Sequence, residues 1–121
     1  ISMLISHFVC IAIIIFSSCR TTIGKKLRFV YHNYNEMVQA IDGLMRNECA
    51  NISKKYSIGQ SVEGRELLVM KLSVGPNIHQ LLQPRFFYEG NLHGNEASTK
   101  EILLHLVKYL CVQFKAGNQR I

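Results

Sequence analysis

Several residue types that mark specialised proteins are scarce in this chain of 121 residues. It has no tryptophan, two prolines and eight glycines. Collagen needs glycine at every third position, and disordered or low-complexity chains are rich in proline and poor in apolar residues. Because 48% of the residues are hydrophobic and 18% are charged, the composition is that of a globular protein. The length gives room for one small domain.

Acidic residues are also few, with eight Asp and Glu against 14 Lys and Arg, so the net charge is +6. Such a charge could attract nucleic acid or an anionic membrane. However, the basic residues are scattered singly or in pairs, such as Lys25-Lys26 and Lys54-Lys55. No aromatic platform and no zinc-finger spacing accompanies them. The pattern indicates a solvated basic surface and no nucleic-acid partner.

The first nineteen residues carry no charged side chain, and residues 4–16 form an apolar run. Small residues follow it at positions 17–19, as is typical before a signal-peptidase cut. We therefore expect a signal peptide over residues 1–19, with cleavage near Cys19, and a protein that is secreted or enters the secretory pathway. The alternative is a membrane anchor, but a spanning helix needs about 20 apolar residues. Membrane association is expected only if this segment is retained.

Two further features bear on the compartment. Removal of the signal segment would leave Cys49 and Cys111 as the only cysteines. They could pair in a secreted protein, but each lies near the end of a predicted helix, where a buried free thiol is an equally good interpretation. The tripeptide Asn51-Ile52-Ser53 is a glycosylation sequon, which predicts a glycan on Asn51 in the secretory pathway.

Hydrophobic periodicity predicts a helix over residues 33–49, with Asn33 and Glu36 as a capping box. Residues 54–61 and 66–74 predict two strands of a hairpin around a turn at 62–65, and residues 85–92 predict a third strand. A second helix is expected after residue 95 and should stop at Gly117. Its predicted apolar stripe consists of Leu103, Leu106, Val107, Leu110 and Phe114.

This element order indicates an α/β layered domain. A sheet of three strands, one of which leads directly into a helix, would leave an unpaired edge. We therefore expect a part of a larger sheet.

The loop between the third strand and the second helix carries the candidate metal ligands, His93 and Glu96. Ligands bind at the carboxyl ends of strands in open α/β sheets. The two residues lie three apart across a bend, where Gly94 permits a sharp turn, so they can converge on one metal ion. The alternative interpretation is a surface histidine beside a glutamate that favours the helix dipole. The spacing alone leaves both interpretations open.

Three ordered motifs carry a family resemblance: YHNY at 31–34, YSIGQSVEGREL at 56–67 and GNLHGNE at 90–96. With them, the segment from Phe29 to about Asn118 resembles the zinc metallocarboxypeptidases, in particular the regulatory branch of carboxypeptidases E, D, N and M. The resemblance implies an α/β/α sandwich with a mixed β-sheet. It also implies a Zn²⁺ cofactor and hydrolysis of the C-terminal peptide bond of peptides or proteins, with preference for Lys or Arg.

By the same resemblance, His93 and Glu96 would be the first two zinc ligands. The third ligand, the arginine that binds the substrate carboxylate and the catalytic glutamate are expected beyond Ile121. On a helix with about 100° per residue, Glu101 lies about 140° and His105 about 180° around from Glu96, so neither can join the same ion. No family role supports His32 or His79.

We therefore expect residues 27–121 to be the N-terminal part of a catalytic domain, truncated and without its catalytic residues. Such a fragment should bind zinc poorly and should not hydrolyse peptides. The alternatives are a non-catalytic carboxypeptidase-like binding module, a truncated product, or a membrane-anchored or basic surface-binding protein with no metal role.

The sequence also departs from the family pattern. It has Thr99-Lys100-Glu101 where Gly-Arg-Glu is usual, which brings the packing of the helix's first turns into question. Glu63 and Arg65 match the family's turn motif, and we interpret them as residues that hold the hairpin.

Overall fold

The computed structural model describes residues 27–79 and 81–121, so the predicted signal peptide at 1–19 lies outside the described residues. The element order is α2 (Tyr34–Arg46), β1 (Ser53–Gln60), β2 (Glu66–Leu72) and α3 (Ala97–Lys115). The expected α/β class is confirmed. Among the described residues, neither helix is long and apolar enough to cross a membrane.

Helix α2 begins at the predicted capping box. The Asn33 side chain accepts a hydrogen bond from the Glu36 amide at 3.0 Å, and the Glu36 carboxylate accepts one from the Asn33 amide at 2.8 Å. These two bonds satisfy amide groups that have no partner within the helix. The helix buries Ile41 and Leu44, which lie three positions apart on one of its faces.

Strands β1 and β2 form the predicted antiparallel hairpin, in which Tyr56 pairs with Val69 and Ser53 with Leu72. Gly64 closes the turn with a φ of 75°, a conformation that glycine adopts without strain. Glu63 and Arg65 form an ion pair across the same turn. This position in the turn agrees with the interpretation that Glu63 and Arg65 hold the hairpin.

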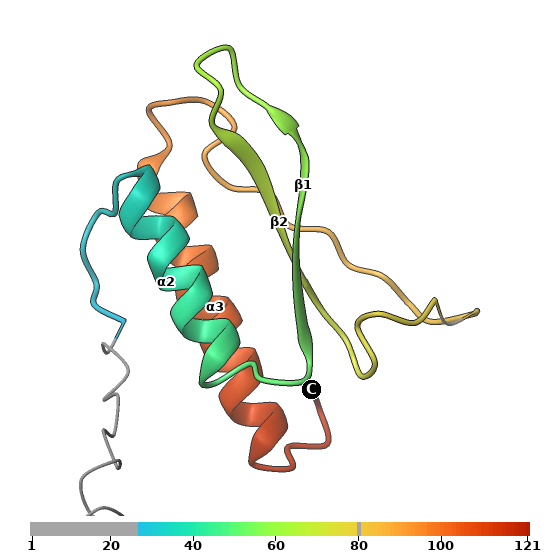
Figure 1. Cartoon of the computed structure of the whole chain (residues 1–121). Helices are drawn as coiled ribbons and strands as arrows, with labels where there is room; N and C mark the ends of the chain where they lie inside the picture. The colour runs from blue at the N-terminus through green and yellow to red at the C-terminus, as the bar shows by residue number, and fades with distance from the viewer. Residues whose placement is uncertain (1–26, 80) are drawn as a thin grey trace, which may run out of the picture.

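The two helices run side by side in the same direction and cover one face of the hairpin (Figure 1). Alternate residues of β2, namely Leu68, Met70 and Leu72, pack against the core that the helices share. This period of two is what a strand with one buried face shows. The buried core residues are Ile41, Leu44, Cys49, Leu104 and Cys111.

A disulfide joins Cys49, just after α2, to Cys111, in the last turns of α3. Both side chains are fully buried. Of the two alternatives that the sequence left open, the free thiols are therefore wrong. The spacing could not decide because the two residues lie 62 positions apart, and only the parallel packing of the helices brings their Cα atoms to 5.1 Å.

The predicted third strand, residues 85–92, is wrong as a strand. Within residues 27–79 and 81–121 the sheet contains β1 and β2 alone, and this segment is an unpaired stretch of chain. A strand requires hydrogen bonds to a neighbouring strand, whatever its composition. Its aromatic side chains Phe86, Phe87 and Tyr88 are accordingly exposed.

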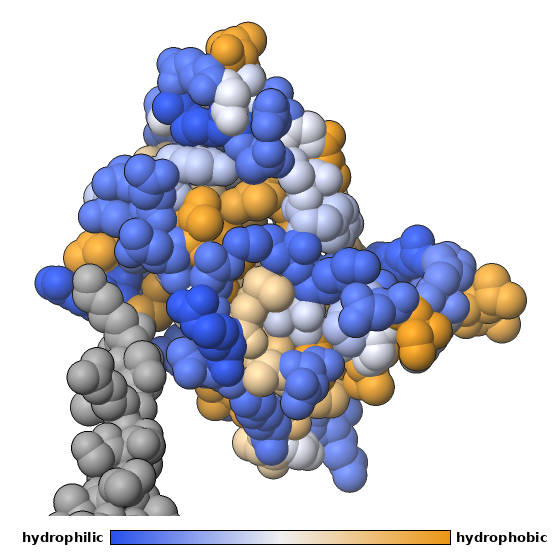
Figure 2. Space-filling view, in the orientation of Figure 1, coloured by the Kyte–Doolittle hydropathy of each residue, from blue (hydrophilic) through white to orange (hydrophobic). Residues whose placement is uncertain are grey.

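After β2, the chain extends away from the hairpin as an arm formed by the described residues 74–79 and 81–86, the last of which overlap the start of this segment (Figure 1). Hydrophobic surface is visible at the end of this arm (Figure 2). The exposed apolar side chains on it are Val74, Ile78, Leu81, Leu82 and Phe86.

The buried face of α3 also differs from the predicted stripe. Glu101, Leu104 and Cys111 are buried, with Val107 packed against them, whereas Phe114 is 39% exposed. The periodicity of α3 did not reveal which of its apolar residues face α2, because apolar side chains surround much of the helix. The predicted stop is confirmed, since Gly117 follows the helix with a φ of 74°.

Candidate metal site

The two predicted metal ligands lie together at the start of α3. His93 Nδ1 is 2.9 Å from Glu96 Oε1, and the His93 amide donates to Glu96 Oε2 at 3.4 Å. Glu96 is the N-cap residue of α3, and its own amide donates to the His93 carbonyl at 3.0 Å. The His93 side chain is 72% exposed and that of Glu96 is 41% exposed. The pair is therefore open to an ion from solvent.

The donor set of this pair fits a zinc ion. Imidazole nitrogen and carboxylate oxygen are both zinc ligands at about 2.0–2.2 Å, which places adjacent ligands of a tetrahedral site ~3.3 Å apart. The separation of 2.9 Å between Nδ1 and Oε1 is that of a hydrogen bond between the two side chains, so they would exchange this bond for bonds to the ion. His93 and Glu96 would hold the ion, and the remaining positions would need other donors.

No group of three or more metal-binding side chains exists in the part of the chain that the structure describes. Glu101 and His105 lie along α3, but each has a different partner. Glu101 Oε2 is 2.6 Å from His32 Nδ1. His105 stacks on Phe29 with ring centroids 3.5 Å apart.

The structure thus separates Glu101 and His105 from the pair, as the helical spacing predicted. No pattern in the sequence indicated the contact of Glu101 with His32, which lies 69 residues earlier in the chain.

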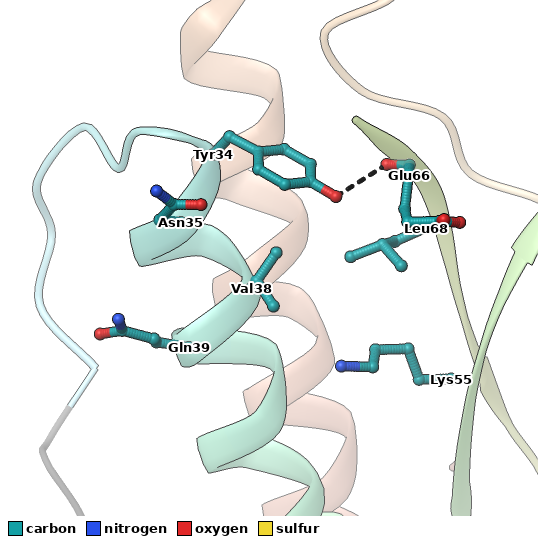
Figure 3. A pocket seen from close by; sticks show the side chains of 7 residues that line it. All are labelled: Tyr34, Asn35, Val38, Gln39, Lys55, Glu66 and Leu68. Atoms are coloured by element: carbon teal, nitrogen blue, oxygen red, sulfur yellow. Dashed lines mark hydrogen bonds between the residues drawn. The ribbon is translucent and has the colours of Figure 1, made fainter. Parts of the chain in front are cut away.

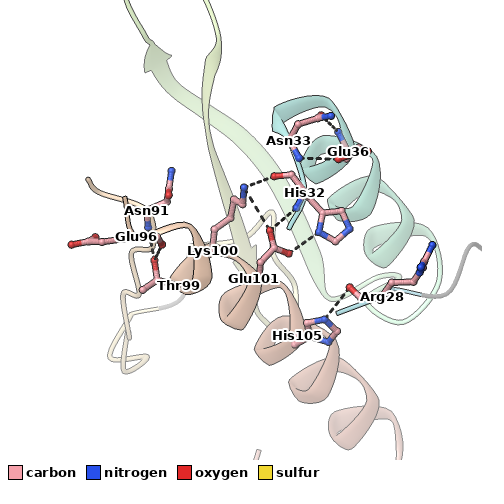
Figure 4. A network of polar contacts seen from close by, with 10 residues as sticks. All are labelled: Arg28, His32, Asn33, Glu36, Asn91, Glu96, Thr99, Lys100, Glu101 and His105. Atoms are coloured by element: carbon pink, nitrogen blue, oxygen red, sulfur yellow. Dashed lines mark hydrogen bonds and ion pairs between the residues drawn. The ribbon is translucent and has the colours of Figure 1, made fainter. Parts of the chain in front are cut away.

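The His32–Glu101 contact belongs to a polar network between the segment before α2 and the first turns of α3 (Figure 4). Glu101 Oε1 accepts a hydrogen bond from the His32 amide at 2.8 Å, and Lys100 Nζ donates to the His32 carbonyl. Burial raises the pKa of Glu101, but the hydrogen bonds from His32 and the positive charges of His32 and Lys100 outweigh it. The pKa of Glu101 is therefore lowered from its ordinary value of 4.5.

Thr99 is a functional candidate that the sequence reasoning treated only as a packing question. Its hydroxyl accepts a hydrogen bond from the Asn91 amide at 2.7 Å and donates one to the Glu96 carbonyl at 2.7 Å (Figure 4). The sequence signal was the departure from the expected family pattern, with threonine at a position where the resemblance implies glycine. The contact of the Thr99 hydroxyl with Asn91 could not be predicted, because it depends on where the loop places Asn91 relative to α3.

A shallow groove of about 540 Å³ lies between α2 and the hairpin (Figure 3). Neither His93 nor Glu96 lines it. Tyr34 from α2 crosses it and donates to the Glu66 carbonyl at 3.1 Å. The groove is therefore a feature of helix-to-hairpin packing, separate from the candidate metal pair.

The family model described as zinc carboxypeptidase matches residues 37–121. The chain therefore belongs to the zinc carboxypeptidase family. It is 46% identical over 93 residues to the human (Homo sapiens) carboxypeptidase N catalytic chain, 42% over 95 residues to human carboxypeptidase Z, and 44% over 86 residues to mouse (Mus musculus) carboxypeptidase D. These relatives place it in the regulatory branch that the motifs indicated.

The alignments cover 77%, 78% and 71% of this chain. They cover 20%, 14% and 6% of the respective relatives, so the chain spans a fifth or less of their lengths.

Proposed function

We propose that residues 27–121 form the N-terminal part of the catalytic domain of a zinc metallocarboxypeptidase. The observation that carries the proposal is the match of residues 37–121 to the zinc carboxypeptidase family, with His93 and Glu96 in contact in the matched segment. The substrate would be the C-terminus of a peptide or protein. The resemblance to the regulatory branch supports release of a C-terminal Lys or Arg.

In this proposal, His93 and Glu96 bind the zinc ion, and their contacts with the loop orient them. A zinc ion held by His93 and Glu96 would polarise the scissile carbonyl and lower the pKa of a water molecule. Glu96 has a second carboxylate oxygen 3.4 Å from the His93 amide, and this contact holds the carboxylate toward the loop. The third ligand, the arginine for the substrate carboxylate and the general base would come from chain beyond Ile121. By itself, a chain with two ligands should bind zinc poorly and should not cleave peptides.

Substitution of the first ligand tests the proposal. In the full-length gene product, His93→Ala should lower the zinc content strongly and abolish release of C-terminal Arg from a peptide, because one of three protein ligands is lost. His79→Ala is the matched control, since His79 contacts Arg85 and lies outside the pair. Unchanged zinc content in His93→Ala would refute the ligand assignment.

A second candidate is a carboxypeptidase-like binding module without catalysis, because the described residues hold no group of three metal-binding side chains and both candidates allow this. The full-length transcript distinguishes the two. A histidine, an arginine and a glutamate in family context after residue 121 support the enzyme, and their absence supports the binding module.

We further propose that the protein enters the secretory pathway through a signal peptide at residues 1–19 and carries a glycan on Asn51. The buried disulfide supports this, because disulfides persist in oxidising compartments. The residue Asn51 is exposed in the turn between α2 and β1, as a glycosylated residue must be.

A further inference from the structure

The loop that carries the metal pair is closed by one side chain. Asn91 lies at its start and Glu96 at its end, and the hydroxyl of Thr99 reaches both, at 2.7 Å from the Asn91 nitrogen and 2.7 Å from the Glu96 carbonyl oxygen. The Thr99 amide adds a bond of 3.0 Å to the same carbonyl. A threonine hydroxyl often bonds a carbonyl three residues earlier in a helix. The additional bond to Asn91 is what joins the two ends of the loop.

The backbone before the loop is shaped to bring Asn91 within reach. A Cβ atom on Gly90 would lie 3.1 Å from the Thr99 carbonyl carbon and 2.8 Å from a methyl group of Leu103. Glycine makes this close approach to the first turns of α3 without any shift of these neighbours. Asn91 then adopts a φ of 61°, a left-handed conformation that costs free energy in a residue other than glycine. The hydrogen bond to Thr99 offsets part of that cost.

The metal pair itself has little other support. The side chains of His93 and Glu96 are exposed, and Glu96 makes no side-chain capping bond to α3. The position of the loop therefore depends on hydrogen bonds to its backbone groups. The bonds of the Thr99 hydroxyl connect the backbone at the two ends of the loop. Groups that orient metal ligands from outside the coordination sphere commonly contribute 10–100-fold to metal affinity.

We propose that Thr99 is a positioning residue. Its hydroxyl bridges the two ends of the loop from Asn91 to Glu96 by hydrogen bonds, and this keeps His93 and Glu96 in positions from which both can bind one zinc ion. This role rests on the proposed function, since it requires the pair to be ligands.

The test compares three variants of the full-length gene product. Thr99→Val keeps the branched shape but loses the hydroxyl, Thr99→Ser keeps the hydroxyl, and Ser98→Ala removes an exposed hydroxyl from the neighbouring position as a control. Zinc affinity, measured by competition with a chelator, should fall about tenfold in Thr99→Val. Affinity should stay near the wild-type value in Thr99→Ser and Ser98→Ala.

A second measurement follows the hydrogen bond between the Asn91 amide and the Thr99 hydroxyl in the absence of metal. Hydrogen exchange of the Asn91 amide in the zinc-free protein should accelerate in Thr99→Val and remain slow in Thr99→Ser. Wild-type zinc affinity in Thr99→Val, or an Asn91 amide that exchanges equally in all variants, overturns the positioning role. If His93→Ala lowers zinc affinity while Thr99→Val does not, the proposal on Thr99 fails and the proposed function stands. If His93→Ala has no effect on zinc affinity, the proposed metal site fails, and the positioning role fails with it.

Discussion

At the scale of single residues, Glu101 shows how one buried carboxylate can be satisfied by a distant segment. It is 8% exposed, and an unpaired charge there would be costly. His32 donates its backbone amide to one oxygen and places its ring 2.6 Å from the other. The segment before α2 is thereby attached to α3, five residues after the candidate ligand Glu96.

This network predicts a pH-dependent stability. Because the pKa of Glu101 is lowered below 4.5, its ionised form contributes stability that is present above about pH 4.5 and is lost as the pH falls through the lowered value. Glu101→Gln should therefore reduce the free energy of unfolding at pH 7 by about 2 kcal/mol, the range for a hydrogen bond to a charged group. The difference from the wild type should shrink as the pH falls through the lowered pKa of Glu101.

Urea unfolding of both proteins from pH 3 to 7 measures this difference. Glu63→Gln is the control, because the Glu63–Arg65 ion pair is exposed and should contribute little at any pH. A constant difference between Glu101→Gln and the wild type across this range would contradict the assigned role of the ionised carboxylate.

At the scale of elements, α2 and α3 are joined at both ends. The polar network around Glu101 connects the segment before α2 to the start of α3, and the disulfide from Cys49 to Cys111 connects the far ends. Lys115 adds a bond of 2.6 Å to the Asn47 carbonyl near the disulfide. With five buried core residues described, these links supply order that a small core would not maintain alone.

Removal of the disulfide should therefore destabilise the helix pair. A cross-link that closes a loop of 62 residues is worth about 4 kcal/mol in the chain-entropy account. The double variant Cys49→Ser/Cys111→Ser should lower the free energy of unfolding by up to about that amount, which denaturant titration would measure. Thiol titration of the unreduced, unfolded wild type provides the check, since modification of Cys49 or Cys111 would show that they are not paired.

At the scale of the whole molecule, the structure shows one layer of helices on a two-stranded hairpin, with an exposed aromatic segment beside it. Phe86 is 84% exposed and Phe87 is 75% exposed. Large apolar side chains gathered in this way are typical of surfaces that another element covers. This agrees with the proposal that the chain is part of a larger catalytic domain.

The compartment is also a property of the whole molecule, and it has a direct test. Expressed in a secretory cell, the protein should appear in the medium, and enzymatic removal of N-linked glycans should increase its electrophoretic mobility. Asn51→Gln should abolish that shift if no other sequon in the full-length product is used, whereas Asn47→Gln, which changes a nearby asparagine outside the sequon, should not. An unmodified protein that remains inside the cell would contradict both proposals.

The sequence alone was sufficient for features that depend on neighbouring residues. The capping box of α2, the hairpin with its turn at Gly64 and the end of α3 at Gly117 follow from local backbone preferences and periodicity. The approach of His93 to Glu96 was anticipated because three residues separate them.

Contacts between distant segments were decided only by the tertiary structure. The pairing of Cys49 with Cys111, the partner of Glu101 and the reach of the Thr99 hydroxyl to Asn91 depend on how helices and loops pack. Residues 85–92 illustrate the same limit, since their composition favours a strand but no neighbouring strand pairs with them among the described residues. Local preferences act along the chain, whereas a disulfide, a buried ion pair and a sheet each require a partner that packing brings near.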